Sequence, residues 1–260
     1  MHVHLENKVV LVTGGAKGVG AAIVRAIAEE GGLPIFIDSD VASARELQTA
    51  LSDDGLPSHF VECDLCSAGN CATAVGRACQ LEKRLDALIN NAGGNDSLSL
   101  EKGTPEQFVS SLERNLHHYY NVAHYAVPAL KSARGSIINI VSEAALSDLD
   151  SASGYAAITG AILALTREWA AELVAFGMRV NAIVPAEGMT PPYQRWPATF
   201  ENPRQKLSTM VSKAPPGKRM RNAQGIAAMA LFLLSPHAAH ITGQHIFVDG
   251  GSMPLDRALT

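Results

Sequence analysis

The chain has 260 residues, 47% of them hydrophobic, with a formal net charge of −4 and a pI near 6.1. This length and composition can bury the core of one sizeable domain, so we expect a single domain over residues 1–260. Acidic and basic residues are interspersed along the chain, which argues against nucleic acid or an anionic membrane surface as a partner.

The first fifteen residues show no basic region followed by an apolar run, and no later apolar stretch reaches the roughly 20 residues of a membrane span. We therefore expect a cytoplasmic protein. The four cysteines lie close together in the sequence, at Cys63, Cys66, Cys71 and Cys79. A zinc or redox site would need a second ligand pair or a strand-to-helix placement, and neither is evident. We expect free thiols and no metal.

Strand-length apolar runs alternate with longer segments of helical periodicity. The expected strands lie at residues 8–14, 33–38, 58–64, 85–91, 135–142, 178–185 and 243–251. Helical patterns include residues 19–32, 44–55, 106–131, 155–177 and 223–235. Nearly continuous Val, Ile and Leu strands between helices are typical of a parallel sheet that is covered on both faces. The sequence therefore predicts an α/β fold with a doubly wound, seven-stranded parallel sheet.

Residues 186–222 interrupt this alternation with several prolines and no clear periodicity. A long irregular segment in a compact domain is usually a lid or a binding loop, so we expect a substrate lid here. Aromatic faces with hydrogen-bonding neighbours suit a sugar ring. The side chains of this kind in the segment are Glu187, Tyr193, Gln194, Arg195 and Trp196.

A glycine pattern follows the first expected strand. Gly14, Gly18 and Gly20 are spaced G-x-x-x-G-x-G directly before a helical segment. Glycines permit a tight turn and a close approach of the backbone to a pyrophosphate, whose charge is met by the helix N-terminus. The pattern alone also fits an ordinary strand-to-helix turn, but in this alternating fold it predicts a dinucleotide site.

Asp38, at the end of the second expected strand, bears on the choice of dinucleotide. A carboxylate there can accept both adenosine ribose hydroxyls and repels a 2′-phosphate, which favours NAD over NADP. Lys17 argues the other way, because its charge could meet a 2′-phosphate, although it could equally be a solvated turn residue. Asp38 could instead be a helix N-cap or a turn residue. We give Asp38 the greater weight and expect NAD.

Further motifs follow in a characteristic order. Residues 90–93 read Asn-Asn-Ala-Gly, Asn115 lies in a helical segment, Ser142 ends the fifth expected strand and Tyr155 opens the next helical segment. Together with the glycine pattern, this set resembles the classical short-chain dehydrogenase/reductase family over essentially the whole chain. Within the family, four segments are most similar to bacterial L-fucose dehydrogenases and, more distantly, to a 17β-hydroxysteroid dehydrogenase. These segments are residues 111–128, 165–173, 185–191 and 248–260.

The resemblance implies a Rossmann-type single domain, a homotetramer and hydride transfer between a substrate carbinol and a nicotinamide. It implies Tyr155 as the acid/base, Ser142 as the residue that holds the reacting oxygen, and Asn115 as support for a proton-relay water. The expected cofactor contacts are Gly14, Lys17, Gly18, Val19, Gly20, Asp38, Asp64, Leu65, Asn91, Ala92, Gly93, Tyr155, Thr159, Pro185, Ala186, Gly188 and Thr190. The expected substrate contacts are Ser142, Glu143, Glu187, Tyr193, Arg195 and Trp196. Standing alone, each residue also fits a cap or a turn, and Glu143 fits an exposed loop carboxylate.

Thr159 departs from the family pattern Y-x-x-x-K. The family lysine binds the nicotinamide ribose and stabilises the tyrosinate, whereas Thr159, on the same helix face as Tyr155, carries no charge. A tyrosine at the ordinary pKa of about 10 would be only about 10⁻³ ionised at pH 7, a penalty of roughly 4 kcal/mol. Arg167 lies about 18 Å further along the helix and cannot substitute. His117 and His118 follow Asn115 closely, and we expect one of them to be a packed helix residue.

We interpret the chain as an NAD-dependent oxidoreductase for a hydroxyl of a sugar or related polyol. The substrate is an aldose such as L-fucose, or a sugar acid whose carboxylate Arg195 could hold. Two alternatives stay open. Thr159 favours a dinucleotide-binding protein with impaired catalysis, and the family also contains dehydrogenases for steroids and other apolar alcohols.

Overall fold

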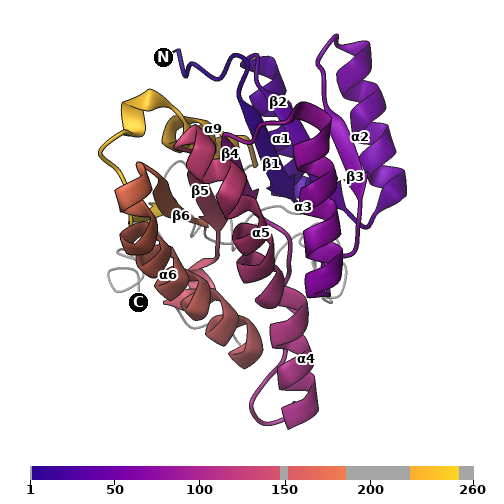
Figure 1. Cartoon of the computed structure of the whole chain (residues 1–260). Helices are drawn as coiled ribbons and strands as arrows, with labels where there is room; N and C mark the ends of the chain where they lie inside the picture. Colours follow the sequence, from indigo (N-terminus) through magenta and orange to yellow (C-terminus); the bar gives the residue numbers. More distant parts are fainter. Residues whose placement is uncertain (1, 147–151, 186–222, 252–260) are drawn as a thin grey trace.

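The computed structural model describes residues 2–146, 152–185 and 223–251, and within these ranges seven strands form one sheet (Figure 1). The order is β3-β2-β1-β4-β5-β6-β7, and every neighbouring pair is parallel. The strands are β1 Val9–Thr13, β2 Leu33–Asp38, β3 His59–Glu62, β4 Ala87–Asn90, β5 Ser136–Ile140, β6 Arg179–Pro185 and β7 His245–Val248. The predicted seven-stranded parallel sheet is confirmed.

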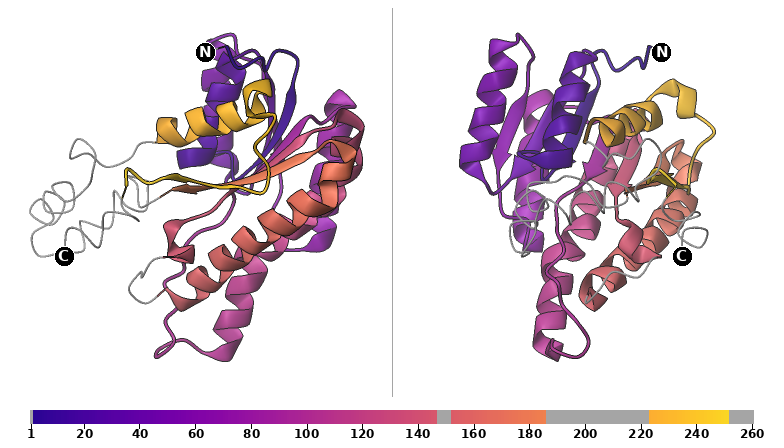
Figure 2. Two further views of the ribbon diagram at one scale, coloured as in Figure 1. Left: turned by 90° about the vertical axis from the view of Figure 1, so that its left-hand side faces the viewer. Right: turned by 180° about the vertical axis from the view of Figure 1, so that it is seen from behind.

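Helices cover both faces of the sheet, as Figure 2 shows. One face carries α1 Gly18–Glu29, α2 Val41–Asp53 and α9 Ala223–Leu234, and the other carries α3 Ala68–Glu82, α5 His117–Ala133 and α6 Ser153–Leu173. Along β1, Val9 and Leu11 enter the core under α3, α5 and α6, while Val10 and Val12 enter the core under α1, α2 and α9. Because side chains alternate across a strand, a strand buried on both faces must be apolar throughout.

The strand order reverses between β1 and β4, so the connections leave these two strands toward opposite sides of the sheet. A crevice forms at the carboxyl ends of parallel strands at such a switch point, and open α/β sheets bind their ligands there. The glycine pattern follows β1 and residues 91–93 follow β4. The topology therefore brings these two motifs to one place.

The helical pattern expected over residues 106–131 is two helices rather than one. Helix α4, Pro105–Asn115, is separated by one residue, Leu116, from α5, which begins at His117. The backbone N–H of Tyr119 donates to the carbonyl of Leu116 at 3.0 Å, whereas in an uninterrupted α-helix it would donate to that of Asn115. Helix α3 was absent from the helical patterns named above, and it contains Cys71 and Cys79.

Three further expectations from the sequence concern the cysteines, membrane-spanning helices and the lid. All four cysteines are free, as expected, and burial raises the pKa of the Cys71 thiol to about 11, which keeps it protonated. None of the helices in the described ranges combines the length and apolar character needed to cross a bilayer. The expected lid, residues 186–222, lies outside the described residues.

Candidate active site

The loop after β1 is built from glycines that a larger residue could not replace without a backbone shift. A Cβ at Gly14 would lie 2.8 Å from Cα of Ala92, and one at Gly20 would lie 2.0 Å from the carbonyl oxygen of Gly14. Helix α1 begins at Gly18, and the preceding Lys17 side chain makes no capping hydrogen bond. The first N–H groups of α1 thus have no side-chain cap and can meet a phosphate. The loop fits a dinucleotide pyrophosphate.

Asp38 ends β2 beside this loop and is half-buried. Its two carboxylate oxygens accept hydrogen bonds from the backbone N–H groups of Ala16 and Asp40, both at 2.9 Å. Asp38 is not the N-cap of α2, because Asp40 holds that position and accepts from the N–H of Ser43. Each oxygen of Asp38 keeps a second lone pair that can accept a ribose hydroxyl.

Lys17 is paired rather than free. Its Nζ lies 2.6 Å from Oδ2 of Asp40. The hydrogen bond from Lys17, followed by those from Ser43, lowers the pKa of Asp40 to about 2, so the carboxylate stays charged at working pH. The charge of Lys17 is therefore already opposed by an acidic partner.

Residues 91 and 92 are held against the end of β1 by Thr13. The Oγ1 of Thr13 accepts from the backbone N–H groups of Asn91 at 2.9 Å and Ala92 at 3.1 Å. The side-chain amide of Asn91 donates in return to the carbonyls of Thr13 at 3.1 Å and Gly14 at 2.9 Å. Thr13 is a site residue that sequence reasoning missed, and its only signal was its place directly before Gly14.

The other expected contacts on the adenosine side lie at the same edge of the sheet. Leu65, after β3, is buried, whereas the neighbouring Asp64 is exposed. The pKa of Asp64 is lowered by its interaction with the Cys66 side chain and by the N–H of Cys66, which donates to the Asp64 carboxylate at 3.0 Å. Val19, in the first turn of α1, packs against the core under α1, α2 and α9.

Asn115 lies at the break between α4 and α5 and is buried, with 8% of its surface exposed. Its Oδ1 accepts from the backbone N–H of Gly94 at 3.0 Å. A Cβ built on Gly93, whose φ is +124°, would lie 3.4 Å from Oδ1 and 4.0 Å from the main-chain oxygen of Asn115. The helix break thus places two oxygens of Asn115 beside Gly93.

Ser142 and Tyr155 are brought together as the sequence predicts. Ser142 follows β5 and caps a short 3₁₀ turn, Glu143–Ala145, by accepting from the N–H of Ala144 at 3.3 Å. Its side chain also lies close enough to the Tyr155 hydroxyl to affect that group's pKa. Burial raises the pKa of Tyr155, and the interaction with Ser142 lowers it in part; among the described residues no positive charge contributes. The two side chains can position a substrate hydroxyl and transfer its proton. Among the described residues, however, no cation lies beside Tyr155 to stabilise its ionised form.

Thr159 is turned to the backbone of its own helix. It is 1% exposed, and its Oγ1 donates to the carbonyl of Tyr155 at 2.8 Å, with Ala156 O at 3.2 Å. Such back-bonding is common for threonine within a helix. The hydroxyl proton of Thr159 is therefore used inside α6, and only the oxygen lone pairs remain for a ribose hydroxyl.

The structure rules out one of the alternatives that the sequence offers for Glu143. Glu143 is not an exposed loop carboxylate but is buried, with 9% of its surface exposed, in the turn directly after Ser142. Of the carboxamide contacts, Pro185 is half-buried at the end of β6 and pairs with Val248 of β7. The remaining expected contacts lie outside the described residues: Ala186, Glu187, Gly188, Thr190, Tyr193, Arg195 and Trp196.

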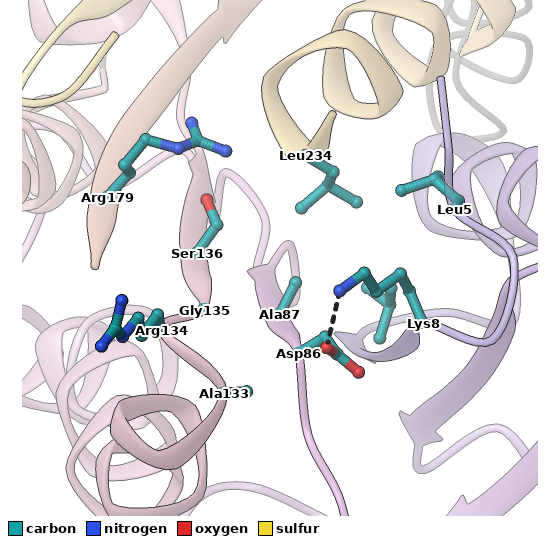
Figure 3. Close-up of a pocket in the computed structure, with 11 residues that line it drawn as sticks. Leu5, Lys8, Asp86, Ala87, Ala133, Arg134, Gly135, Ser136, Arg179 and Leu234 are labelled. Atoms are coloured by element: carbon teal, nitrogen blue, oxygen red, sulfur yellow. Dashed lines mark hydrogen bonds and ion pairs between the residues drawn. The ribbon is translucent and has the colours of Figure 1, made fainter. Parts of the chain in front are cut away.

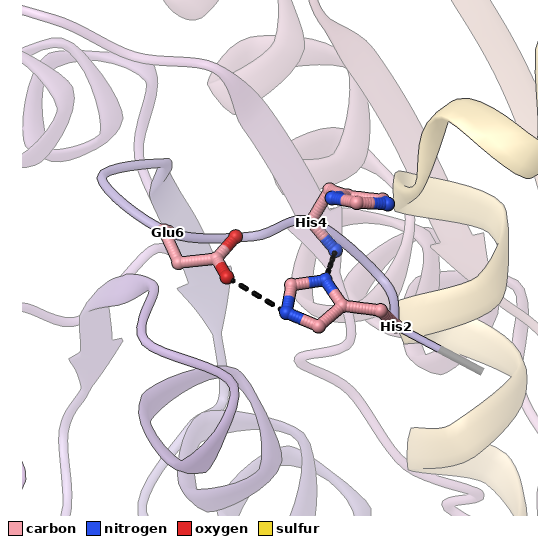
Figure 4. A group of neighbouring side chains, drawn as sticks. All are labelled: His2, His4 and Glu6. Carbon is pink, nitrogen blue, oxygen red and sulfur yellow. Dashed lines mark hydrogen bonds and ion pairs between the residues drawn. The ribbon is translucent and has the colours of Figure 1, made fainter.

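Two other clusters lie away from this edge. His2, His4 and Glu6 approach one another near the N-terminus, where Nε2 of His2 is 3.0 Å from Oε1 of Glu6 (Figure 4). All three are exposed, and their proximity is accounted for by the His2–Glu6 contact and by the backbone N–H of His4, which donates to Nδ1 of His2 at 3.3 Å.

At the amino ends of β1, β4, β5 and β6 lies a small pocket in which Lys8 and Asp86 point toward each other (Figure 3). Asp86 also accepts from Arg84 and from the N–H of Val9, while Arg179 donates to main-chain carbonyls. These charged groups tie the opposite edge of the sheet together.

Comparisons with known proteins agree with this arrangement. Residues 14–253 match the family model described as Enoyl-(Acyl carrier protein) reductase. The L-fucose dehydrogenase of Rattus norvegicus is 35% identical over 248 residues, which cover 95% of this chain and 90% of that protein. The probable galactose dehydrogenase of Rhizobium meliloti (strain 1021) is 32% identical over 249 residues, 95% of each chain. The crystal structure of Cj0485 dehydrogenase is 38% identical with a TM-score of 0.93, covering 100% of this chain and 99% of that one.

Proposed function

Because the chain belongs to the short-chain dehydrogenase/reductase family, we propose that it oxidises a hydroxyl group of a sugar or related polyol with NAD. The observation that carries the proposal is the proximity of the Ser142 and Tyr155 side chains at the edge of the sheet where the glycine loop also lies. The similarity to an L-fucose and a probable galactose dehydrogenase supports a sugar as the substrate. An aldose is our first choice, and a sugar acid is the variant to test beside it.

A bound nicotinamide dinucleotide supplies the hydride acceptor for this reaction. Ser142 would hold the substrate hydroxyl, and the ionised oxygen of Tyr155 would take its proton as the O–H bond breaks. The carbinol hydrogen would leave with its electron pair to that acceptor, and the substrate would become a carbonyl compound. Asn115, with two oxygens beside Gly93, holds a water through which the proton leaves the site.

The choice of NAD over NADP rests on two side chains. The Asp38 carboxylate lies beside the glycine loop, where it accepts ribose hydroxyls and repels a 2′-phosphate. Lys17 would favour the phosphate, but its charge is opposed by Asp40 at 2.6 Å. A substrate lid at 186–222, a homotetrameric assembly and a cytoplasmic location belong to the same proposal, on the precedent of the family.

A second candidate function is dinucleotide binding with little turnover. The specific observation that favours it is at Tyr155, where burial raises the pKa and no described cation lowers it. Oxidised nicotinamide is itself cationic and would lower that pKa when bound. We therefore expect oxidation of the substrate at alkaline pH. The presence or absence of this activity distinguishes the two candidate functions.

The experiment is a screen of aldoses, sugar acids and steroids for NAD reduction from about pH 6 to about pH 10.5, which brackets the ordinary tyrosine pKa. The Tyr155→Phe variant is the control, since it keeps the ring and removes the proton acceptor. We expect a neutral or acidic sugar to be oxidised, with a rate that rises with pH and is lost in the variant. Binding of NAD without turnover at any pH would select the second candidate, and turnover of steroids alone would refute a sugar substrate.

A further inference from the structure

His118, in the first turn of α5, is a buried histidine for which the described part of the chain offers no hydrogen-bond partner. Only 2% of its surface is exposed, and neither ring nitrogen has a partner among the described residues. Burial, and to a smaller extent the neighbouring His117, lowers the pKa of His118 to about 4, so the ring is neutral at working pH. A neutral imidazole carries one donor and one acceptor, and leaving both unused inside a protein is costly. Such a group needs an explanation.

The ring lies beside the crevice. Nε2 of His118 would be 3.8 Å from a Cβ built on Gly93, and the same point is 3.4 Å from Oδ1 and 4.0 Å from the main-chain oxygen of Asn115. Three polar atoms therefore lie within 4.0 Å of the point that a Cβ of Gly93 would occupy. At φ +124° an L side chain would also be strained there.

The strand order shows which part of a dinucleotide would pass this space. Asp38 ends β2, the glycine loop follows β1, Gly93 follows β4, and Ser142 follows β5. A dinucleotide with its adenosine ribose at Asp38, its pyrophosphate at the glycine loop and its reacting ring at Ser142 crosses these strands in that order. The second ribose then lies at the end of β4, beside Gly93.

We propose that His118 provides the polar contact to the nicotinamide ribose that a lysine at position 159 makes in the family. Its Nε2 bonds a ribose hydroxyl, directly or through one water shared with Asn115, on the side that faces Gly93. The inference rests on the proposed function in assuming that a nicotinamide dinucleotide binds. A neutral ring anchors the ribose but, unlike lysine, adds no charge beside Tyr155. His118 is thus a cofactor-positioning residue, and Thr159 only completes the packing of α6.

Binding measurements with three ligands test this. AMP contains the adenosine ribose alone, ADP-ribose adds the second ribose, and NAD adds the nicotinamide. We expect His118→Phe to weaken NAD and ADP-ribose about tenfold in isothermal titration, with AMP unchanged, since one hydrogen bond to the second ribose is lost. His118→Asn should recover part of the loss. The matched control is His117→Phe, one residue away and exposed, which should bind all three ligands like the wild type.

A second readout does not depend on how the variants fold. In wild-type protein with labelled histidine, the Cε1–H resonance of His118 should shift on adding ADP-ribose and stay in place on adding AMP. Equal affinity of wild type and His118→Phe for ADP-ribose, or a resonance that does not respond to it, overturns the inference and leaves the proposed function standing. A wild-type protein that binds no NAD overturns both.

Discussion

Replacing Thr159 by lysine tests directly what holds catalysis back at neutral pH. Residues four apart on a helix have Cβ atoms about 5–6 Å apart, so an ammonium group from this position can come close to the Tyr155 hydroxyl. At an effective dielectric constant of about 20 and a separation of about 6 Å, one positive charge stabilises the tyrosinate by roughly 3 kcal/mol. This corresponds to an approximately hundredfold larger tyrosinate fraction below the pKa of the phenol.

The buried position of Thr159 reduces that gain. Its side chain is 1% exposed, and its hydrogen bond to the carbonyl of Tyr155 would be lost, which costs about 1 kcal/mol. The lysine stem must also extend into the crevice to keep its charge hydrated. We therefore expect Thr159→Lys to raise kcat/KM for the best alcohol at pH 7 by about tenfold to a hundredfold, and to move the pH optimum down.

The measurement is kcat/KM for NAD reduction as a function of pH. Thr159→Met is the matched control, because it introduces a side chain of similar length without the charge and so reports the packing cost alone. An unchanged pH profile in Thr159→Lys, with a melting temperature near that of the wild type, would refute the reasoning. Equal increases in kcat/KM for Thr159→Lys and Thr159→Met would also refute it.

Three further predictions concern the cofactor loop and the buried histidine. Asp38→Asn should reduce the preference for NAD over NADP about tenfold in titrations, because a repulsion of about 1–2 kcal/mol is removed, whereas Lys17→Ala should leave NAD affinity unchanged. Gly20→Ala should lower the melting temperature and weaken NAD binding, since its Cβ would lie 2.0 Å from a carbonyl oxygen. The control is Gly76→Ala, whose Cβ would have nothing within 4 Å and which should stabilise α3 by about 0.5–1 kcal/mol. Equal effects of the two substitutions on the melting temperature would contradict this prediction. The pKa of His118 is about 4 in the folded protein and about 6.5 unfolded, so the unfolded chain binds more protons between these values and stability falls as pH falls through that window, by roughly 3 kcal/mol. Urea unfolding should show this fall in wild type and its loss in His118→Phe; the same slope in both would disprove it.

The amino-acid sequence by itself determined the sheet and the order of the motifs along its edge. Apolar runs with a period suited to buried strands, separated by helical periods, specify strands and crossover helices through short-range geometry. In a parallel sheet the carboxyl ends of all strands meet at one edge. Gly14, Asp38, Gly93 and Ser142 lie at or shortly after the carboxyl ends of their strands, and this was enough to predict that they share a site.

Only the tertiary structure decided which side chains of the site are buried and which already have ion-pair or hydrogen-bond partners. These features depend on contacts between segments that are far apart in the chain. Examples are the ion pair of Lys17 with Asp40, the hydrogen bonds of Thr13 with the backbone of residues 91 and 92, and the burial of Glu143 and His118. A helical period continued through residues 106–131, yet the structure broke it at Leu116. Local periodicity reports which face of an element is apolar, whereas burial and hydrogen bonding are set by what the rest of the fold places against that face.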